Sequence, residues 1–332
     1  MKSLIVLLVS LALAACSQGQ SDIERHQPER NNVVDVSKEI KVIGFEDLIA
    51  SRFAYIKVLG NYIVITDLRS PDKLIHIYDK SSFTHMGDTG CLGQGPGEIS
   101  SIGPVTYDSR NNSLYVSDYG SMNIYSYSIN EAVNDSLYLP EVKYKLNRGI
   151  EPVEYVYLND SLSYGCFSVS SSSDSYREVC GKMNHQTGSV QIHNYEYPDL
   201  RVYRNVFDYS IKHNLIVECS TRYDLITMLD GNLNMKCRIF GPQWNRNGDH
   251  RSHFKSVAFY KNYFIASYDG TKYEERNKPT ICHVFDIEGN YIKTLDVGFR
   301  IWRISADEDN DRLYFTFDDD IQFGYLDLKG LL

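Results

Sequence analysis

The chain is 332 residues long, its formal net charge at pH 7 is −9, and 23% of its residues are charged. Nucleic-acid-binding proteins need lysine and arginine clustered on one surface, so the acidic balance argues against a DNA- or RNA-binding protein. The charges are spread along the chain, which also argues against a large disordered tail.

The first fifteen residues predict an export signal. Lys2 precedes the apolar run SLIVLLVSLALAA, which is too short to span a bilayer and suits the hydrophobic region of a signal peptide. The run ends in LAAC, Leu13 to Cys16, which resembles the bacterial lipobox. The resemblance implies removal of residues 1–15 and lipidation of Cys16 with enough acyl chains for stable anchoring, hence a cell-envelope lipoprotein of the outer membrane. The alternative is an ordinary signal peptide with a chance cysteine.

A flexible tether is predicted over residues 16–32. The segment SQGQSDIERHQPERNN, from Ser17 to Asn32, contains one isoleucine and no other aliphatic or aromatic residue. Such a segment cannot bury enough apolar surface to fold by itself. We therefore expect it to link the lipid to a folded domain that spans residues 33–332.

A repeat of about 50 residues runs through this domain. Six apolar alternating runs share a shape, and their equivalent positions are Tyr62, Leu114, Leu162, Leu215, Tyr263 and Leu313. The spacings between these positions are 52, 48, 53, 48 and 50 residues. A period near fifty that is carried by strands is typical of a propeller or another repeat array.

Each unit is predicted to contain four short strands. Within residues 104–146 the runs PVTYD, SLYVSD, IYSYSI and EVKYKL alternate in polarity and are separated by Asn, Gly, Ser and Asp turns. The unit that begins near Ser51 repeats this order. We therefore predict an all-β fold, a six-bladed β-propeller with four-stranded antiparallel blades.

Both ends of the domain are predicted to close the ring. The last unit has only three strands, WRISAD, RLYFTFDD and IQFGYLDL, before Leu332. The unassigned run VVDVSKEIKVI at 33–43 can supply the fourth, outermost strand and so protect an edge that would otherwise invite aggregation. Specifically, we expect residues 33–37 to pair with the strand at 321–327.

The glycine-rich stretch GCLGQGPGEIS, residues 90–100, lies between the first two units. It has neither the GxGxxG spacing nor the Lys-Ser/Thr of a P-loop, and no helix follows, so a nucleotide site is not expected. The glycines instead permit positive φ angles where the chain crosses from the rim of one blade to the centre of the next.

Residues 90–128 carry a family resemblance. The pattern G-x-x-G-x-G-x-G-E-I, followed by PVTYD, NNSLYVSD and NIYSYS, resembles an NHL-type repeat. The GQGPGE turn after a lipobox is similar to the TolB-like six-bladed propeller lipoproteins of Gram-negative bacteria. The match weakens after the second unit, where segments 241–254 and 297–303 replace the glycine-rich turn. The resemblance implies a fold and export and supplies no catalytic residue.

Antiparallel strand order predicts which loops share a face of the ring. Glu98, in the first crossing, should lie on the same face as the aspartates that close second strands, Asp67, Asp118, Asp269 and Asp318. Propeller ligands usually bind at the mouth of the central channel, where such loops converge. The alternative is structural: each aspartate accepts hydrogen bonds from its own turn, and Glu98 holds its own loop.

The segment 241–254 combines an aromatic side chain with cations, namely Trp244, Arg246, His250, Arg251 and His253. Such a group suits a sugar ring or a carboxylate. Alternatively, Trp244 only covers the neighbouring blade. The HxxH spacing of His250 and His253 lies in a loop without a helix, so no metal site is predicted.

Other crossings add positive charge that could face the same mouth, from Arg201, Arg204, Arg300 and Arg303, together with Trp302. The predicted ligand-binding residues of the channel mouth are Asp67, Glu98, Asp118, Arg204, Trp244, His253, Asp269 and Arg303. No catalytic residue and no metal ligand is assigned.

Six cysteines follow Cys16, and the predicted export permits disulfides. Cys166 with Cys180, and Cys219 with Cys237, lie on predicted neighbouring strands, so cross-strand bridges are conceivable. Free buried thiols are the favoured alternative, because a sequence cannot fix disulfide connectivity.

Two functions from different classes remain. The first is a lipid-anchored module that binds a peptide, a glycan or an envelope protein through its loop face, favoured because GxSxG and HExxH motifs are absent. The second is a hydrolase or lyase whose calcium ion is held in the channel by Glu98, Asp67, Asp118 and Asn123. No cofactor is expected for the first function. A purely structural role in an envelope complex is a third possibility.

Overall fold

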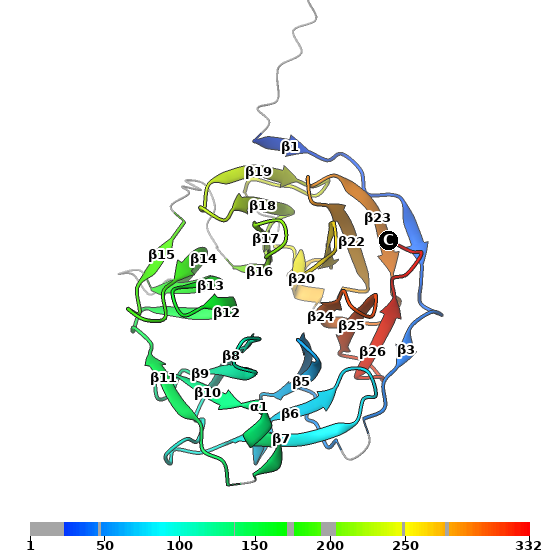
Figure 1. Cartoon of the computed structure of the whole chain (residues 1–332). Coiled ribbons are helices and arrows are strands. Elements are labelled where there is room, and N and C mark those ends of the chain that lie inside the picture. The colour runs from blue at the N-terminus through cyan, green and yellow to red at the C-terminus, as the bar shows by residue number, and fades with distance from the viewer. Residues whose placement is uncertain are drawn as a thin grey trace, which may run out of the picture.

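The computed structural model describes residues 23–45, 48–135, 137–170, 176–193, 204–247, 250–275 and 279–332. The predicted signal peptide, Cys16 and Arg201 lie outside the described residues. Six antiparallel sheets stand in a ring around a central axis, each with four sequential strands except the last (Figure 1). The prediction of a six-bladed, all-β propeller is therefore confirmed.

The blades are numbered 1 to 6 in chain order, and their strands run from the axis outward. Blade 1 consists of β4 (Ala54–Leu59), β5 (Tyr62–Asp67), β6 (Lys73–Asp79) and β7 (His85–Cys91). Blade 2 consists of β8 (Ile102–Asp108), β9 (Ser113–Asp118), β10 (Asn123–Ser128) and β11 (Glu141–Lys145). Blade 3 consists of β12 (Ile150–Asn159), β13 (Leu162–Ser170), β14 (Tyr176–Met183) and β15 (Val190–Ile192). Blade 4 consists of β16 (Asn205–Ser210), β17 (Leu215–Ser220), β18 (Leu225–Asp230) and β19 (Met235–Phe240). Blade 5 consists of β20 (Phe254–Tyr260), β21 (Tyr263–Tyr268), β22 (Ile281–Asp286) and β23 (Tyr291–Asp296). Blade 6 contains β24 (Ile301–Asp307), β25 (Arg312–Phe317) and β26 (Phe323–Asp327).

Two short helices interrupt the strands. The helix α1 (Ile129–Asn134) connects β10 to β11, and its N-terminal turn is capped by the Ser128 side chain, which accepts from the backbone N–H of Glu131. A single 3₁₀ turn, η1 (Tyr273–Glu275), precedes β22. Among the described residues, no helix is both long enough and apolar enough to cross a membrane.

The hydrophobic core is a ring of six clusters, one between each pair of neighbouring blades. The second strands explain this arrangement, because every residue of β9 and β17 is buried. A strand buried on both faces needs a partner sheet on each side, and only a closed ring supplies both to every blade. The cluster between blades 6 and 1 joins Tyr314 of β25 to Ile63 of β5, so the ring is closed by packing as well as by hydrogen bonds.

The N-terminal segment wraps around the outside of three blades, and we call residues 23–43 the strap (Figure 1). Its first two strands, β1 (Glu24–His26) and β2 (Val33–Asp35), pair in parallel with the outermost strands of blades 4 and 5. Its third strand, β3 (Lys41–Val42), pairs antiparallel with β26 and completes blade 6. The strap covers the outer edges of consecutive sheets, which removes three open edges at once.

Two expectations about this segment are corrected. Residues 33–35 pair with Thr294, Leu295 and Asp296 of blade 5, and it is residues 41–42, later in the same run, that pair with Gly324 and Tyr325 of blade 6. The predicted tether of residues 16–32 is also too long, because β1 and the loop after it lie on the propeller surface.

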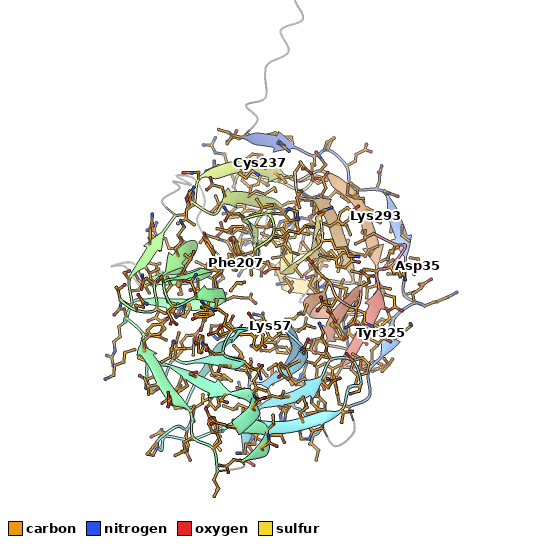
Figure 2. The ribbon with its side chains drawn as sticks, viewed as in Figure 1. Asp35, Lys57, Phe207, Cys237, Lys293 and Tyr325 are labelled. Carbon is orange, nitrogen blue, oxygen red and sulfur yellow. The ribbon has the colours of Figure 1, made fainter. Side chains whose placement is uncertain are left out.

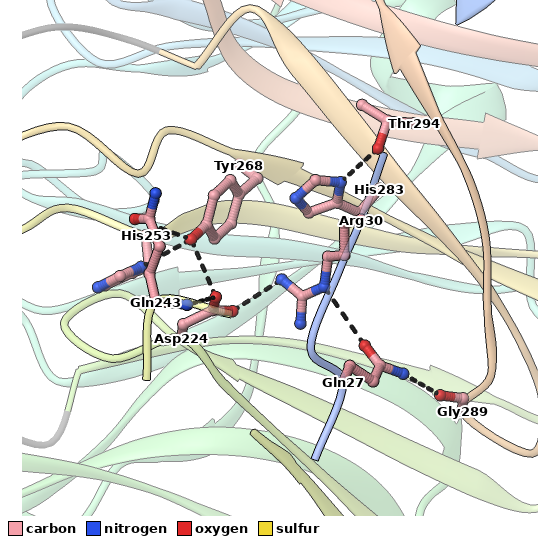
Figure 3. Close-up of polar contacts among 9 residues, drawn as sticks. All are labelled: Gln27, Arg30, Asp224, Gln243, His253, Tyr268, His283, Gly289 and Thr294. Carbon is pink, nitrogen blue, oxygen red and sulfur yellow. Dashed lines mark hydrogen bonds and ion pairs between the residues drawn. The ribbon is translucent and has the colours of Figure 1, made fainter. Parts of the chain in front are cut away.

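Arg30 anchors the strap between blades 4 and 5 (Figure 3). Its Nη1 lies 2.7 Å from Oδ1 of Asp224, and both side chains are buried, with exposed fractions of 3% and 0%. The guanidinium also lies 5.7 Å from the ring centroid of Tyr268 and 5.3 Å from that of Phe285. Burial, with the nearby Arg30 charge, holds the pKa of His283 well below its usual range, so this histidine stays neutral.

Candidate functional site

A cavity of about 440 Å³ occupies the axis of the ring. The innermost strand of every blade contributes to its wall, namely β4, β8, β12, β16, β20 and β24. We call the face with the blade-to-blade crossings the crossing face, and the face with the turns between first and second strands the turn face. The wall runs from Tyr55 and Arg303, near the crossing face, to Gly60, Ser109 and Ile211 at the turn face. A volume of this size is typical of small-molecule sites.

Four charged side chains line the cavity: Lys57, Glu154, Asp208 and Arg303. Lys57 lies on the inner side of the ring, as does Phe207 (Figure 2). Lys57 Nζ is 3.2 Å from Glu154 Oε1, and the two side chains are 24% and 30% exposed. Because Lys57 belongs to blade 1 and Glu154 to blade 3, this ion pair reaches past blade 2 inside the channel.

Asp208 is surrounded by protein but keeps part of its surface on the channel. Its carboxylate accepts hydrogen bonds from the backbone N–H groups of Phe259, at 2.7 Å, and Tyr209, at 2.8 Å. Burial raises the pKa of Asp208 to about 6, and the nearby Glu154 charge adds to the rise, whereas the hydrogen bonds and Lys57 oppose it.

Asp208 is one of several side chains that tie one inner strand to the next. Ser256 and Ser305 play the same part in blades 5 and 6, where their hydroxyls accept from the backbone N–H groups of Ile304, at 3.1 Å, and Val58, at 2.9 Å. An inner strand exposes N–H groups toward the axis, and these side chains satisfy them. The wall is thereby fixed by bonds between blades.

Arg303 has no carboxylate partner among the described residues. Its guanidinium lies 4.6 Å from the ring centroid of Tyr55, and its buried Nε has no hydrogen-bond partner within the described chain. A register shift between Ile301 and Arg303 leaves Trp302 as the bulged residue of β24, and Trp302 contacts Tyr55 edge to face at 6.0 Å. Bulges commonly redirect side chains near binding sites. The arginine therefore lines the cavity without a carboxylate partner from the described chain, while its Nε is enclosed by protein.

The predicted crossing-face carboxylates hold loops together. Asp67 accepts from the backbone N–H of Ser51 at 2.7 Å, and Asp118 accepts from Ser101 at 2.8 Å and Gly120 at 3.0 Å. These bonds join each crossing to the loop between second and third strands, so the predicted sharing of one face is confirmed. Both aspartates are buried, and a ligand contact at either stays a prediction.

Glu98 closes its own glycine-rich loop, because its Oε2 accepts from the backbone N–H of Gly95 at 2.7 Å. A Cβ atom at Gly93 would lie 1.9 Å from the same oxygen, so the loop can wrap the carboxylate only with glycine there. The remaining spare lone pairs of Glu98 are what a ligand could use.

The other predicted residues are scattered over the crossing face. His253 is buried between blades 4 and 5, with its Nδ1 3.2 Å from the hydroxyl of Tyr268 (Figure 3). Trp244 packs on Phe240 of its own blade, with ring centroids 4.7 Å apart. Arg204 is exposed at the start of β16. Asp269 accepts from the Thr271 hydroxyl at 2.5 Å, while its buried Oδ2 has no partner among the described residues.

Of the eight predicted ligand-binding residues, Arg303 is the one that lines the axial cavity. Lys57, Glu154 and Asp208 were not predicted. Lys57 interrupts the apolar strand β4 with a charge, which was a usable signal in the sequence, whereas β12 and β16 contain further polar residues. Charged residues also occur on the solvent face of any half-exposed strand. A charge within a strand therefore indicates the cavity only once the innermost strands are known.

No three His, Cys, Asp or Glu side chains of the described chain are grouped so as to hold a metal ion. In particular, the carboxylates of Asp67 and Asp118 are each bonded within their own blade, as stated above. The cysteines after Cys16 are all free thiols, and five of them are buried. Burial raises the pKa of Cys166 and of Cys180 well above the usual value, which makes these thiols unreactive.

Comparisons with known proteins support the fold. No protein-family model and no curated protein sequence matches the chain. Similar solved structures include the β-propeller domain of Cps50 (Swd1) from Myceliophthora thermophila, with TM-score 0.54 and 7% identity over 87% of this chain and 99% of that one. A putative exported protein from Bacteroides fragilis matches with TM-score 0.55 and 11% identity, over 92% and 98% of the two chains. A DUF4221 family member from Bacteroides vulgatus matches with TM-score 0.54 and 12% identity, over 87% and 98%. At these identities the likeness shows the β-propeller fold alone.

Proposed function

We propose that the protein is a binding module that holds a carboxylate-bearing ligand in its axial cavity. The observation that carries this proposal is the Arg303 guanidinium, which lines the cavity, lies over Tyr55 and has no carboxylate partner among the described residues. A hydrogen bond to a charged group contributes about 1.5–3 kcal/mol, which a ligand carboxylate at this guanidinium would gain.

Carboxylate chemistry suits this arginine best. A guanidinium presents parallel N–H donors that match the two oxygens of a carboxylate, and stacking on an aromatic ring preorganises its plane. Tyr55 supplies that ring, and Trp302 contacts Tyr55 edge to face. The cavity supplies only one other cation, Lys57, which is already paired with Glu154, so a polyanion such as a nucleoside triphosphate is disfavoured.

The residues that line the cavity favour ligand binding without catalysis. Neither histidine nor cysteine is among the residues that line the cavity. The hydroxyls of Ser256 and Ser305 accept from neighbouring backbone N–H groups, and neither is hydrogen-bonded to a histidine or a carboxylate of the described chain that could serve as its general base. A ligand carried on a glycan or a peptide would have its remainder near the loops of the ring, where Arg204 is exposed.

Isothermal titration calorimetry tests the proposal with three probes: benzoate, D-glucuronate and trialanine. At least one should bind, and the variant Arg303→Gln should weaken that binding by roughly ten- to a hundredfold, because a hydrogen bond to a charged group contributes about 1.5–3 kcal/mol. The uncharged counterparts benzamide, glucose and trialanine amide should bind less tightly than the acids.

The matched control is Arg110→Gln, which removes an exposed arginine outside the cavity wall. The proposal is overturned if none of the three acids binds, or if Arg303→Gln and Arg110→Gln bind them equally well. Mass spectrometry of the recovered probe should show it unchanged, and a converted probe would favour an enzyme instead.

We also propose that the module is held in the cell envelope by a lipid on Cys16, as the LAAC sequence suggests. The exported description of the structurally similar Bacteroides fragilis protein and the TolB-like or NHL-type pattern of residues 90–128 support this location. Labelling of cells with radioactive palmitate should mark the wild type and leave Cys16→Ser unmarked. An unmarked wild type would contradict the proposal.

A further inference from the structure

We propose that the ligand of the axial cavity is a zwitterion, an amino acid or a short peptide, and that Lys57 occupies the place of its ammonium group until it binds. This inference rests on the proposed function and adds the second charged group of the ligand. It is argued from the distribution of charge over the cavity wall.

The cavity wall is electrically polarised. In a ring of six blades, blade 6 stands opposite blade 3 and blade 1 stands opposite blade 4 (Figure 1). Arg303 and Lys57 come from the neighbouring blades 6 and 1, whereas Glu154 and Asp208 come from the neighbouring blades 3 and 4. The two cationic side chains are therefore attached to one side of the channel wall, and the two carboxylates are attached to the opposite side.

The net charge of the lining side chains is zero when all four are ionised. A ligand with a carboxylate alone would engage Arg303 and leave Glu154 of the acidic wall paired with Lys57. A zwitterion complements both walls, and such matching of opposite charges gives specificity because wrong partners leave buried charges unpaired.

Lys57 bridges the two walls in the structure. Its ammonium group lies 3.2 Å from Glu154, so the acidic wall already holds an ammonium, presented on a flexible side chain rooted in the opposite wall. Arg303, by contrast, rests on Tyr55 and reaches no carboxylate of the described chain. The carboxylate end of the site is thus open, while the ammonium end is occupied by an internal group.

A ligand ammonium would displace Lys57 from Glu154. Lysine has a four-carbon stem with several rotatable bonds, so it can leave an ion pair without movement of the backbone. The released Lys57 remains on the same wall as Arg303 and adds to the attraction for the ligand carboxylate. The internal ion pair therefore neutralises Glu154 while the site is empty, and a ligand ammonium group has to compete with Lys57 for that carboxylate.

Calorimetry with one peptide in three forms tests the inference: trialanine, N-acetyl-trialanine and trialanine amide. Trialanine should bind at least about tenfold more tightly than either capped form, because each cap removes one charged hydrogen-bonding group. Alanine and dialanine, measured alongside, show which length fits the cavity.

Two variants separate recognition from folding. Glu154→Gln should weaken trialanine by about tenfold or more and should not weaken N-acetyl-trialanine, because the capped peptide has no ammonium group and the released Lys57 can only add to the attraction for its carboxylate. Lys57→Met should tighten trialanine, since Glu154 then lacks its internal partner. Lys236→Met, at an exposed position of β19 outside the cavity, is the matched control and should change neither affinity.

The possible results distinguish this inference from the proposed function. If N-acetyl-trialanine binds as tightly as trialanine, or if glucuronate binds and no peptide does, the ammonium site is wrong and the carboxylate site stands. If trialanine amide binds as tightly as trialanine, the carboxylate site at Arg303 is wrong. If Lys57→Met weakens trialanine as much as Glu154→Gln does, Lys57 is a binding residue and not a stand-in for the ligand.

Discussion

Asp208 combines two tasks in one side chain. Its carboxylate accepts the N–H of Phe259 and so joins blade 4 to blade 5, and it also contributes negative charge to the axial cavity. The equivalent bonds in blades 5 and 6 are made by the neutral hydroxyls of Ser256 and Ser305. A neutral group would therefore have sufficed for the structure, which is consistent with a use for the charge in ligand binding.

The pKa of Asp208 predicts a specific dependence of stability on pH. The folded-state pKa of about 6 lies above the usual value of 3.8, so the folded protein binds this proton more tightly than the unfolded chain does. The contribution of Asp208 to the free energy of unfolding is therefore greatest below pH 4 and is lost as the pH rises through about 6. Urea denaturation at several pH values should show that the difference in stability, wild type minus Asp208→Asn, falls across this window. A difference that stays constant from pH 4 to pH 7 would contradict the prediction.

Gly60, at the turn-face end of the cavity, is required by its backbone and by its surroundings. Its φ angle is +61°, and a Cβ atom there would lie 2.5 Å from Cε1 of Tyr107 in the next blade. Gly60→Ala should lower the free energy of unfolding by about 1–3 kcal/mol, from backbone strain and overpacking together. The control is Gly44→Ala, where a Cβ would meet nothing within 4 Å. Equal denaturation midpoints for the two variants would refute the argument.

At the scale of elements, the strap depends on a buried ion pair as well as on short strands. Arg30→Met removes the cation beside the buried Asp224, and loss of one partner of a buried pair typically costs about 3–5 kcal/mol. We expect a fall of that size in chemical denaturation. The double variant Arg30→Met/Asp224→Asn should recover part of the loss, because no charge is then left unpaired, whereas Lys38→Met on the exposed part of the strap should change little.

Strands inside the blades were predictable, and the pairings of the strap were not. The blade strands repeat an apolar alternating pattern every 50 residues or so, and a repeated pattern averages out the ambiguity of any single strand. By contrast, β1 and β2 have three residues each, with two of the three exposed, and their partners lie more than 200 residues later in the chain. Their sequence is polar because they cover an edge and have no face of their own to bury.

The residues of the candidate site also divide into one that was predictable from the sequence and three that were not. Arg303 was predicted because the sequence places it in a crossing between blades. The antiparallel order of the strands fixes the face of the ring on which these crossings lie. Lys57, Glu154 and Asp208 are far apart in sequence, and each lies on the innermost strand of a different blade. Their meeting depends on the size and closure of the whole ring, which no local pattern encodes.

At the scale of the molecule, closure of the ring by the strap predicts an asymmetric response to truncation. Removal of residues 1–22 should leave the denaturation midpoint unchanged, because all three strands of the strap are retained. Removal of residues 1–43 uncovers the outer edges of blades 4, 5 and 6 and should lower stability and promote aggregation. Light scattering during thermal denaturation measures both effects. Identical behaviour of the two truncations would show that the strap is dispensable.

The position of the strap also sets the order of events during folding. Lys41 pairs with Tyr325, so two segments separated by almost the whole length of the chain must meet before blade 6 is complete. Contacts at such sequence separation are slow to form, because the loop between them must first be brought into place. When the chain emerges from its N-terminus onward, the strap appears first, yet β1 and β2 find their partners only in blades 4 and 5, and β3 stays unpaired until the final blade is available.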